Sequence, residues 1–201
     1  YGIKTRIAKI DSPGCNLLKW KRLKPIIDKI GPKNKTFLDV GCSEGFYSIC
    51  IAQMGAKHVL GSDLDSMRIK RASLMKEILE VDNVNFETLD LYKIHENKKF
   101  DVVLGLGLLH RIPDIVKCLT KFCNIANTVI VEFKTYKSED DNFYDHGGIA
   151  KLNPYNKLYK TPSIAYIRNR FIELGHKKIE VYEDNVSNLN YPRTIIVASK
   201  E

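Results

Sequence analysis

The chain has 201 residues, 44% of them hydrophobic, with a formal net charge of +8 and an isoelectric point near 9.1. This length suffices for one domain with a full core, and no apolar run reaches the roughly 18 residues of a membrane span. Five scattered cysteines without a CxxC pair predict neither a metal site nor a disulfide framework, and a reducing cytoplasm is the expected compartment. The basic charge suits a polyanionic partner, but the lysines form no single block.

The predicted elements begin with an N-terminal helical segment, residues 1–35. The spacing of its apolar residues predicts a helix from Asn16 to Ile30. This helix contains the only tryptophan, Trp20, which either contacts the substrate or anchors the helix in the core. The basic residues around it, Lys19 among them, are expected on a solvated face or against phosphates.

A buried strand, Phe37–Val40, then breaks into a glycine-containing loop that opens a helix at Phe46. Asp39 lies on the strand just before the loop, and Gly41 and Gly45 allow the backbone to approach a ligand closely. The third glycine of the dinucleotide fingerprint is missing, and an acid before the turn suits a positively charged ligand rather than a pyrophosphate. We therefore expect S-adenosylmethionine, which carries an ammonium, a sulfonium and a ribose but no phosphate.

The next two predicted strands also end in acids. Asp63 closes the second, about 22 residues past Gly41, near the spacing at which a carboxylate meets a ribose in a nucleotide-binding βαβ unit. The third strand, Val84–Thr88, is followed by Asp90, which we expect to accept the exocyclic amine of adenine, with Leu91 against the ring. The predicted cofactor site comprises Asp39, Gly41, Cys42, Ser43, Gly45, Phe46, Asp63, Leu64, Asp90, Leu91, Gly105 and Leu106.

Two candidate catalytic residues follow the next strands. His110 comes just after the fourth predicted strand, Phe100–Leu104, where an acceptor would face the methyl donor. It is a candidate general base, and ordering of the loop is its alternative role. Glu132, at the end of the fifth strand, Thr128–Phe133, is a second candidate for base or substrate contact. Proximity and in-line geometry alone suffice for many methyl transfers.

The remaining chain completes an α/β pattern. Residues 134–160 lack periodicity and are expected to form a substrate-side loop. A helix and two strands, Lys178–Tyr182 and Thr194–Ala198, follow. The alternation predicts a doubly wound, mostly parallel seven-stranded sheet of Rossmann-like type with an antiparallel last strand. Residues 1–201 are expected to form this single domain, trimmed from a longer protein because Tyr1 is not a natural start.

Together these motifs resemble a class I S-adenosylmethionine-dependent methyltransferase over nearly the whole chain. Within that superfamily the sequence is most similar to the tRNA wobble-uridine carboxymethyltransferases and their uncharacterised relatives. The resemblance to the superfamily is specific at Leu38–Phe46, Asp63, Asp90 and Phe100–His110. The similarity to the narrower family includes Tyr1-Gly2, Lys19-Trp20, Leu38–Cys42, Gly107–Arg111, Tyr159–Ser163 and Arg193–Ala198.

The resemblance also implies how a carboxylated cofactor would be bound. That family reads the extra carboxylate with a Lys, a Tyr and an Arg, of which only Arg193 is matched. Leu109 occupies the Tyr position, and the Lys position would precede Tyr1. We therefore expect ordinary S-adenosylmethionine and plain methyl transfer, because an unpaired buried carboxylate is costly. The candidate substrate contacts are Arg193, Tyr159 and Trp20.

The expected reaction is methyl transfer to an oxygen or nitrogen of a sugar, a small metabolite or an RNA base. A small-molecule or glycan acceptor is expected ahead of tRNA, with no membrane partner. One alternative is a tRNA wobble-uridine carboxymethyltransferase that uses carboxy-S-adenosylmethionine, which the basic helix keeps open. Another is a non-catalytic S-adenosylmethionine-binding module, and an NAD-dependent oxidoreductase is disfavoured by the missing third glycine.

Overall fold

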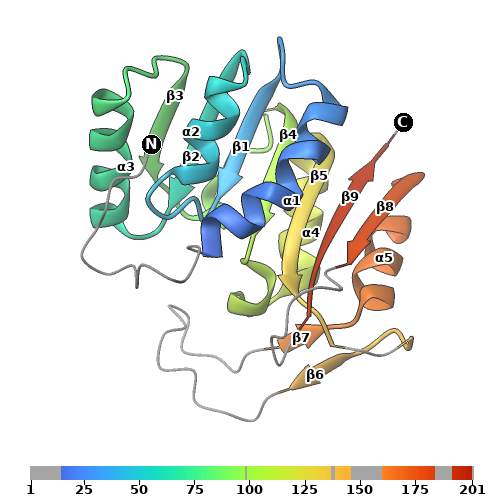
Figure 1. Cartoon of the computed structure of the whole chain (residues 1–201). Helices are drawn as coiled ribbons and strands as arrows, with labels where there is room; N and C mark the ends of the chain where they lie inside the picture. The colour runs from blue at the N-terminus through green and yellow to red at the C-terminus, as the bar shows by residue number, and fades with distance from the viewer. Residues whose placement is uncertain (1–14, 98, 137–138, 146–159, 184–191, 201) are drawn as a thin grey trace.

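The computed structural model describes residues 15–97, 99–136, 139–145, 160–183 and 192–200 (Figure 1). Their helices, 3-10 turns and strands are, in chain order, α1 (Cys15–Ile30), β1 (Thr36–Val40), α2 (Phe46–Gln53), β2 (His58–Asp63), α3 (Ser66–Ile78), β3 (Val84–Thr88), η1 (Leu91–Lys93), β4 (Phe100–Leu106), η2 (Leu109–Arg111), α4 (Ile115–Ile125), β5 (Ala126–Lys134), β6 (Phe143–Asp145), β7 (Lys160–Pro162), α5 (Ile164–Glu173), β8 (Lys178–Glu183) and β9 (Arg193–Ser199).

Seven strands form one sheet in the order β3-β2-β1-β4-β5-β9-β8. The first five strands pair in parallel, whereas β9 runs antiparallel to both β5 and β8. The predicted doubly wound, mostly parallel sheet with an antiparallel last strand is therefore confirmed. The chain builds outward from β1 to β3 and then resumes at β4 on the other side of β1. The carboxyl ends of β1 and β4 thus flank the switch point where ligands bind in such sheets.

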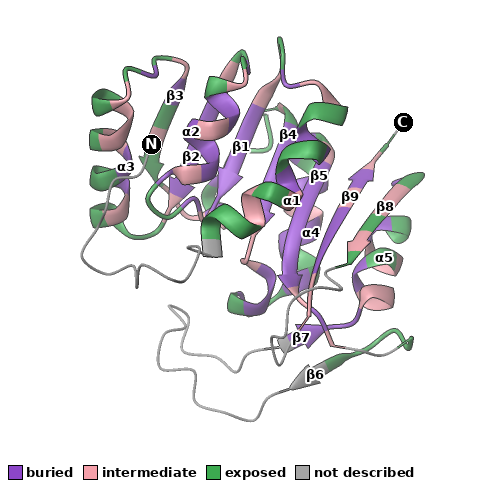
Figure 2. Cartoon of the chain, viewed as in Figure 1, coloured by how far each residue is buried: buried purple, intermediate pink, exposed green. Residues whose placement is uncertain are grey.

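Helices cover both faces of this sheet (Figure 1). α1 and α2 pack on one face, where Leu23 and Phe37 are fully buried, and α4 and α5 pack on the other, around Leu38 and Phe122. Figure 2 shows the central strands buried between these layers. Because both faces are covered, the central strands are continuous apolar runs, which made them visible in the sequence. No helix of the described residues has the length and apolar character needed to cross a membrane.

The stretch expected as a substrate-side loop, residues 134–160, contains structure that the sequence did not indicate. β6 and β7 pair antiparallel as a separate two-stranded sheet, with Phe143 opposite Pro162. Strands of three residues are too short to show a period-two pattern, and proline is unusual within one. Residues 146–159 of the expected loop lie outside the described residues.

Side-chain caps set the first turns of two helices. The Asp114 carboxylate accepts a hydrogen bond from the backbone N–H of Lys117 at 2.8 Å, so α4 begins at the next residue after this cap. The Ser163 hydroxyl accepts one from the backbone N–H of Tyr166 at 2.9 Å and starts α5 in the same way. Such caps satisfy N–H groups that the helix itself leaves without partners.

Candidate functional site

The carboxyl ends of the parallel strands bring the predicted acids to one edge of the sheet. Asp39 lies between Gly61 of β2 and Leu104 of β4 in the strand register. Asp63 ends β2, and its carbonyl accepts a hydrogen bond from the backbone N–H of Leu89, which precedes Asp90. The structure thus places these acids around the switch point, as the spacing indicated.

Asp39 lies beneath this edge, where it is 1% exposed. Its Oδ2 accepts a hydrogen bond from the Ser48 hydroxyl at 2.7 Å. Burial raises the pKa of Asp39 to about 6, although the hydrogen bond from Ser48 and the charge of Lys19 oppose this rise. A cation bound above Asp39 would stabilise its ionised form, which suits the ammonium of the expected cofactor.

The loop after β1 is held against β2 by its backbone. The N–H groups of Gly41 and Cys42 both donate to the carbonyl of Ser62, at 2.7 and 2.9 Å. Gly45 has a φ of +79°, and a Cβ there would lie 2.6 Å from the Phe86 ring. This glycine is therefore required by packing as well as by backbone conformation.

Asp63 combines a structural role with spare hydrogen-bonding capacity. Its Oδ2 accepts from the backbone N–H of Ser43 at 2.9 Å, and its Oδ1 accepts from that of Asp65 at 3.0 Å. A carboxylate can accept about four hydrogen bonds, so both oxygens retain capacity for ribose hydroxyls. Leu64, next to it, is 45% exposed and available to a ligand.

Three other predicted cofactor residues are used by the fold. Asp90 accepts a hydrogen bond from the backbone N–H of Tyr92 at 3.0 Å and starts η1, while Leu91 is packed into the core. A Cβ on Gly105 would lie 2.7 Å from the Phe122 ring, so this glycine lets α4 pack closely on β4. Their contacts with a cofactor remain predictions, as do those of Phe46 and Leu106.

His110 lies on η2 and is 6% exposed. Burial, together with the positive charges of Arg193, Arg111 and Lys134, lowers its pKa to about 3. The imidazole is therefore neutral near pH 7 and is a weak proton acceptor. In this state it is better suited to hold an acceptor by a hydrogen bond than to remove its proton.

Glu132 is fully buried at the end of β5 and is held by two cations. Arg193 donates to it through both Nε and Nη2, the latter at 2.9 Å, and Lys19 Nζ lies 3.0 Å from its Oε2. Burial alone would raise the pKa of Glu132, but the hydrogen bond from Arg193 and the charges of Lys19 and Arg193 outweigh it and lower the pKa. We call Lys19, Glu132 and Arg193 the charge triad.

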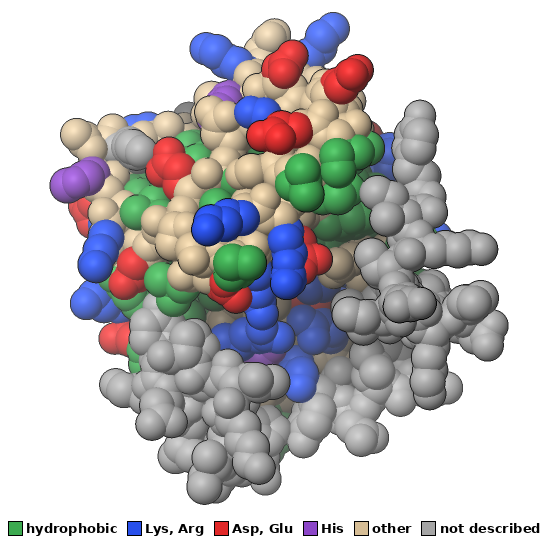
Figure 3. All heavy atoms as spheres, turned by 90° about the vertical axis from the view of Figure 1, so that its left-hand side faces the viewer, with side chains coloured by type: hydrophobic (Ala, Val, Ile, Leu, Met, Phe, Trp, Pro, Cys, Tyr) green, Lys and Arg blue, Asp and Glu red, His purple; other side chains and the backbone are tan. Residues whose placement is uncertain are grey.

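The backbone of β4 continues directly past this triad. Gly107 has a φ of +71°, and its N–H donates to the carbonyl of Glu132 at 2.7 Å. A Cβ on Gly107 would lie 3.3 Å from Arg193 Nη2 and 3.4 Å from Lys19 Nζ. Figure 3 shows lysine and arginine side chains gathered with a histidine in a hollow low on this side of the molecule.

Three basic residues of this region were not among the predicted site residues: Lys19, Arg111 and Lys134. Lys19 lies one turn before Leu23, which is fully buried, so its spacing could have placed it on the inner side of α1. Arg22 on the same helix donates to the carbonyls of Tyr182 and Arg193, at 3.1 and 3.0 Å, and fixes α1 against β8 and β9. No such signal marks Arg111 or Lys134 in the sequence.

The remaining predicted substrate contacts separate into two groups. The Trp20 ring packs against Phe46 and Tyr47 of α2, each with its centroid 6.4 Å away, so Trp20 anchors α1. Tyr159 and Tyr1-Gly2 lie outside the described residues. Among the residues that are described, no cluster of His, Cys, Asp and Glu could hold a metal ion.

Comparison with known proteins identifies the family. A family model described as "Methyltransferase domain" matches residues 32–185. A tRNA U34 carboxymethyltransferase of Campylobacter fetus is 28% identical over 94% of this chain and 67% of its own length. That of Nautilia profundicola is 30% identical over 84% of this chain and 60% of its own length. The chain spans between 57% and 67% of the curated relatives it matches.

Solved structures agree on the fold. Magnesium protoporphyrin IX methyltransferase from Synechocystis, with bound S-adenosylmethionine, superposes with a TM-score of 0.71 at 22% identity, over 92% of this chain and 79% of that one. A putative S-adenosylmethionine-dependent methyltransferase from Listeria monocytogenes gives 0.70 at 21% identity, over 91% of this chain and 98% of that one.

The curated relatives also correct one expectation. A small-molecule or glycan acceptor was expected ahead of tRNA, and that order is wrong, because the relatives that match are named for modification of tRNA. That expectation gave too little weight to the positive charge of the chain, because Lys19, Arg111, Lys134 and Arg193 come from distant segments and gather only in the folded structure. The expected fold, enzyme class and cofactor are confirmed. The chain belongs to the methyltransferase domain family and has the fold of class I S-adenosylmethionine-dependent methyltransferases.

Proposed function

We propose that this chain transfers a carboxymethyl group from carboxy-S-adenosylmethionine to a wobble uridine of tRNA. The observation that carries the proposal is the gathering of Lys19, Arg111, Lys134 and Arg193 around one buried carboxylate and His110. We call the surface around these four cations, Glu132 and His110 the acceptor side, because the proposal assigns the acceptor to it. Such a surface suits both a donor carboxylate and RNA phosphates.

The charge triad supports a carboxylated donor in particular. The sequence matched only Arg193 to the family's three carboxylate readers, but the structure sets Lys19 beside it on the same glutamate. A donor carboxylate that lies against Lys19 and Arg193 would contact two cationic groups at once. Both side chains are largely buried, which strengthens such an interaction relative to water.

The chemistry requires little more than orientation from the protein. A donor of this type supplies a carbon bonded to a sulfonium, which an acceptor oxygen or nitrogen attacks in line as the C–S bond breaks. On this proposal Asp63 holds the ribose, Asp39 the ammonium, and the triad the carboxylate. Neutral His110 orients the acceptor, whose proton passes to solvent because the imidazole binds it weakly. A cytoplasmic location, where tRNA is found, is part of the same proposal.

Plain methyl transfer to the same RNA is the second candidate. It is favoured by Leu109, which occupies the position of the family's carboxylate-reading Tyr and is fully buried. An apolar side chain there donates no hydrogen bond to a carboxylate. The two candidates share the RNA acceptor and differ only in the group that is transferred.

One experiment distinguishes them. Purified protein is incubated with tRNA that lacks wobble modification and with each donor separately, and the nucleosides released by digestion are analysed by mass spectrometry. A carboxymethylated uridine formed only with the carboxylated donor is the expected result. A methylated nucleoside formed with S-adenosylmethionine would establish the second candidate. Absence of any product with both donors would overturn the RNA proposal.

A further inference from the structure

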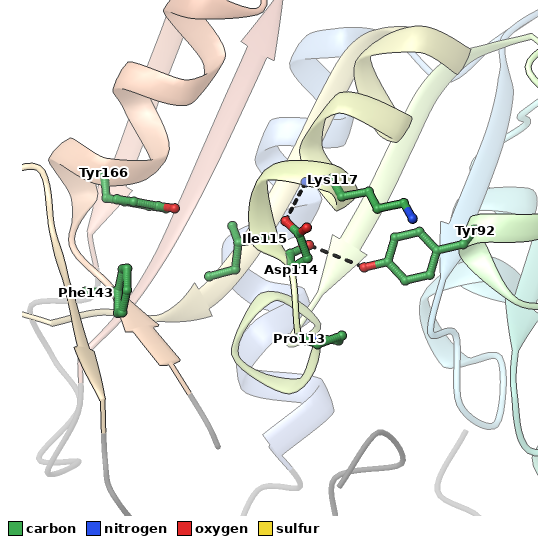
Figure 4. A pocket seen from close by; sticks show the side chains of 7 residues that line it. All are labelled: Tyr92, Pro113, Asp114, Ile115, Lys117, Phe143 and Tyr166. Carbon is green, nitrogen blue, oxygen red and sulfur yellow. Dashed lines mark hydrogen bonds between the residues drawn. The ribbon is translucent and has the colours of Figure 1, made fainter. Parts of the chain in front are cut away.

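A groove lined by aromatic side chains opens beside the acceptor side of the molecule. Tyr92 of η1 forms one wall, Phe143 of β6 and Tyr166 of α5 form the other, and Pro113–Ile115 with Lys117 lie between them (Figure 4). Its volume is about 490 Å³, within the roughly 300–1,000 Å³ of sites that bind small organic groups. We call it the aromatic groove.

The rings of the groove are fixed by their neighbours. The Phe143 and Tyr166 rings meet edge to face, with centroids 5.7 Å apart at 86°. The Tyr92 hydroxyl donates to the carbonyl of Asp114 at 3.3 Å, and Lys117 Nζ lies 5.0 Å from the centroid of the Tyr92 ring. Phe143 is still 38% exposed, so its ring is accessible to a ligand in the groove.

The charges around the groove favour a neutral planar group within it. Arg170, which stacks on Tyr166, is paired with Asp141 and Glu173 at 2.9 Å each, so it brings no excess positive charge to that wall. Asp114 adds a carboxylate at the floor. The Lys117 ammonium also lines the groove and offsets this charge, and a base with an exocyclic amine could stack on the rings and donate to the Asp114 carboxylate.

The position of the groove links it to the reaction. Tyr92 follows Asp90, and Pro113 comes three residues after His110, so the groove adjoins both the predicted adenine contact and the acceptor side. Two exposed cations, Arg111 and Lys117, lie on the segment between His110 and the first turn of α4. Lys117, which lines the groove, could contact a phosphate next to a base that enters it.

We propose that the aromatic groove binds an unpaired nucleobase of the RNA acceptor, next to the nucleotide that is modified. The inference rests on the proposed function, because it names the part of the RNA that this second site recognises. Stacking on aromatic rings is the usual way in which proteins hold bases that are splayed out of a loop. The groove thereby selects a loop rather than a duplex and helps to hold the target nucleotide at the donor.

The test uses anticodon stem-loop RNAs that carry 2-aminopurine at one loop position at a time, since the fluorescence of this base is quenched by stacking on aromatic rings. We expect the protein to quench one position, and Tyr92→Leu and Phe143→Leu to abolish that quenching. Loss of one base stack is worth about 5- to 150-fold in affinity, so KM for tRNA should rise by that order while kcat stays within about twofold.

Three controls keep the result interpretable. Tyr92→Phe and Phe143→Trp retain the rings and should behave as the parent protein does. Tyr182→Leu makes the same Tyr-to-Leu change on β8, where Tyr182 packs on the α1 face of the sheet and Tyr166 on the opposite face, and should leave quenching and KM unchanged. Donor affinity, measured by calorimetry, should be unaffected in every variant, since none of these rings is assigned to the donor.

The outcomes separate this inference from the proposed function. Quenching and KM that persist in both Leu variants would overturn the groove as a base site while leaving tRNA modification intact. Loss of donor affinity in both Leu variants would also overturn it, by showing that the rings support the donor site instead. A parent protein that neither binds the RNAs nor modifies tRNA would overturn the proposed function itself.

Discussion

The two halves of the functional edge differ in charge and in how they are built. One half, to which we assign the donor, contains Asp39 and Asp63 at the carboxyl ends of neighbouring strands. The Ser48 hydroxyl donates a hydrogen bond to Asp39, and the backbone N–H of Ser43 donates one to Asp63. The other half, to which we assign the acceptor, contains the charge triad. Its residues come from α1, β5 and β9, which meet only in the folded chain. A donor with a positive sulfonium suits the acidic half, and an anionic acceptor or donor carboxylate suits the basic half.

The largest effect that would test this difference between the two halves is the loss of stability on substitution of Glu132 in the charge triad. Replacing Glu132 by Gln leaves Lys19 and Arg193 buried without their counter-charge, so we expect a loss of about 3–5 kcal/mol in the free energy of unfolding. Urea denaturation measures it.

The chain offers a matched control for that variant. Glu180 pairs with Lys29, also of α1, at 2.7 Å, but both side chains are partly exposed. Glu180→Gln should therefore cost less than about 1 kcal/mol. If Glu132→Gln costs no more than Glu180→Gln, the triad is not the buried centre of the acceptor half.

On the donor half, Asp63→Ala removes the acceptor assigned to the ribose. Charged hydrogen bonds are worth about 1.5–3 kcal/mol each, so affinity for S-adenosylmethionine should fall by on the order of 100-fold, with the fold retained. Calorimetry measures the affinity, and circular dichroism the fold. Asp82→Ala, at an exposed acid before β3, serves as the control. Micromolar binding that survives in Asp63→Ala would contradict the donor assignment.

Lys19→Met sharpens the comparison, because it removes a cation of the charge triad and leaves the side chains of Asp39 and Asp63 in place. Affinity for the carboxylated donor should fall by about tenfold, since one charge-assisted hydrogen bond is lost, while affinity for ordinary S-adenosylmethionine stays nearly constant. Lys29→Met, on the same helix, should change neither. An equal loss for both donors would show that Lys19 acts through the fold and not on the carboxylate.

The smallest effect concerns acid stability. Because the folded pKa of His110 is lowered to about 3, its contribution to stability is present above pH 6.5 and is lost as pH falls toward 3. The parent protein should therefore lose about 1 kcal/mol more than His110→Gln between pH 6.5 and 5.5. Asp39, with its raised pKa of about 6, contributes with the opposite sign in both proteins and cancels in the difference. Equal pH slopes in urea titrations would contradict the buried neutral imidazole.

The same contrast explains what the sequence could predict. The position of Asp63 at the end of β2 was predicted because a fixed spacing within one βαβ unit links it to Gly41. The central strands were predicted because they are apolar on both faces. The partner of Glu132 could not be found, because Lys19 lies on a helix more than a hundred residues earlier in the chain. Local patterns report local geometry, whereas the basic half depends on how α1 packs across β9.

The aromatic groove was equally beyond the sequence. Tyr92, Phe143 and Tyr166 come from three segments, and only the pairing of β6 with β7 and the packing of α5 bring two of the rings together. His110 was recognised by its position after β4, but its lowered pKa depends on burial and on the distant Arg193. Its chemical state therefore required the folded structure.

The most direct test of the central claim is calorimetric titration of the parent protein with S-adenosylmethionine and carboxy-S-adenosylmethionine side by side. If the basic half reads a donor carboxylate, the carboxylated form binds at least about tenfold more tightly, as one added charge-assisted hydrogen bond requires. Equal or weaker binding of the carboxylated form would contradict that reading. In that case the cations of the acceptor side would bind RNA phosphates and not a donor carboxylate.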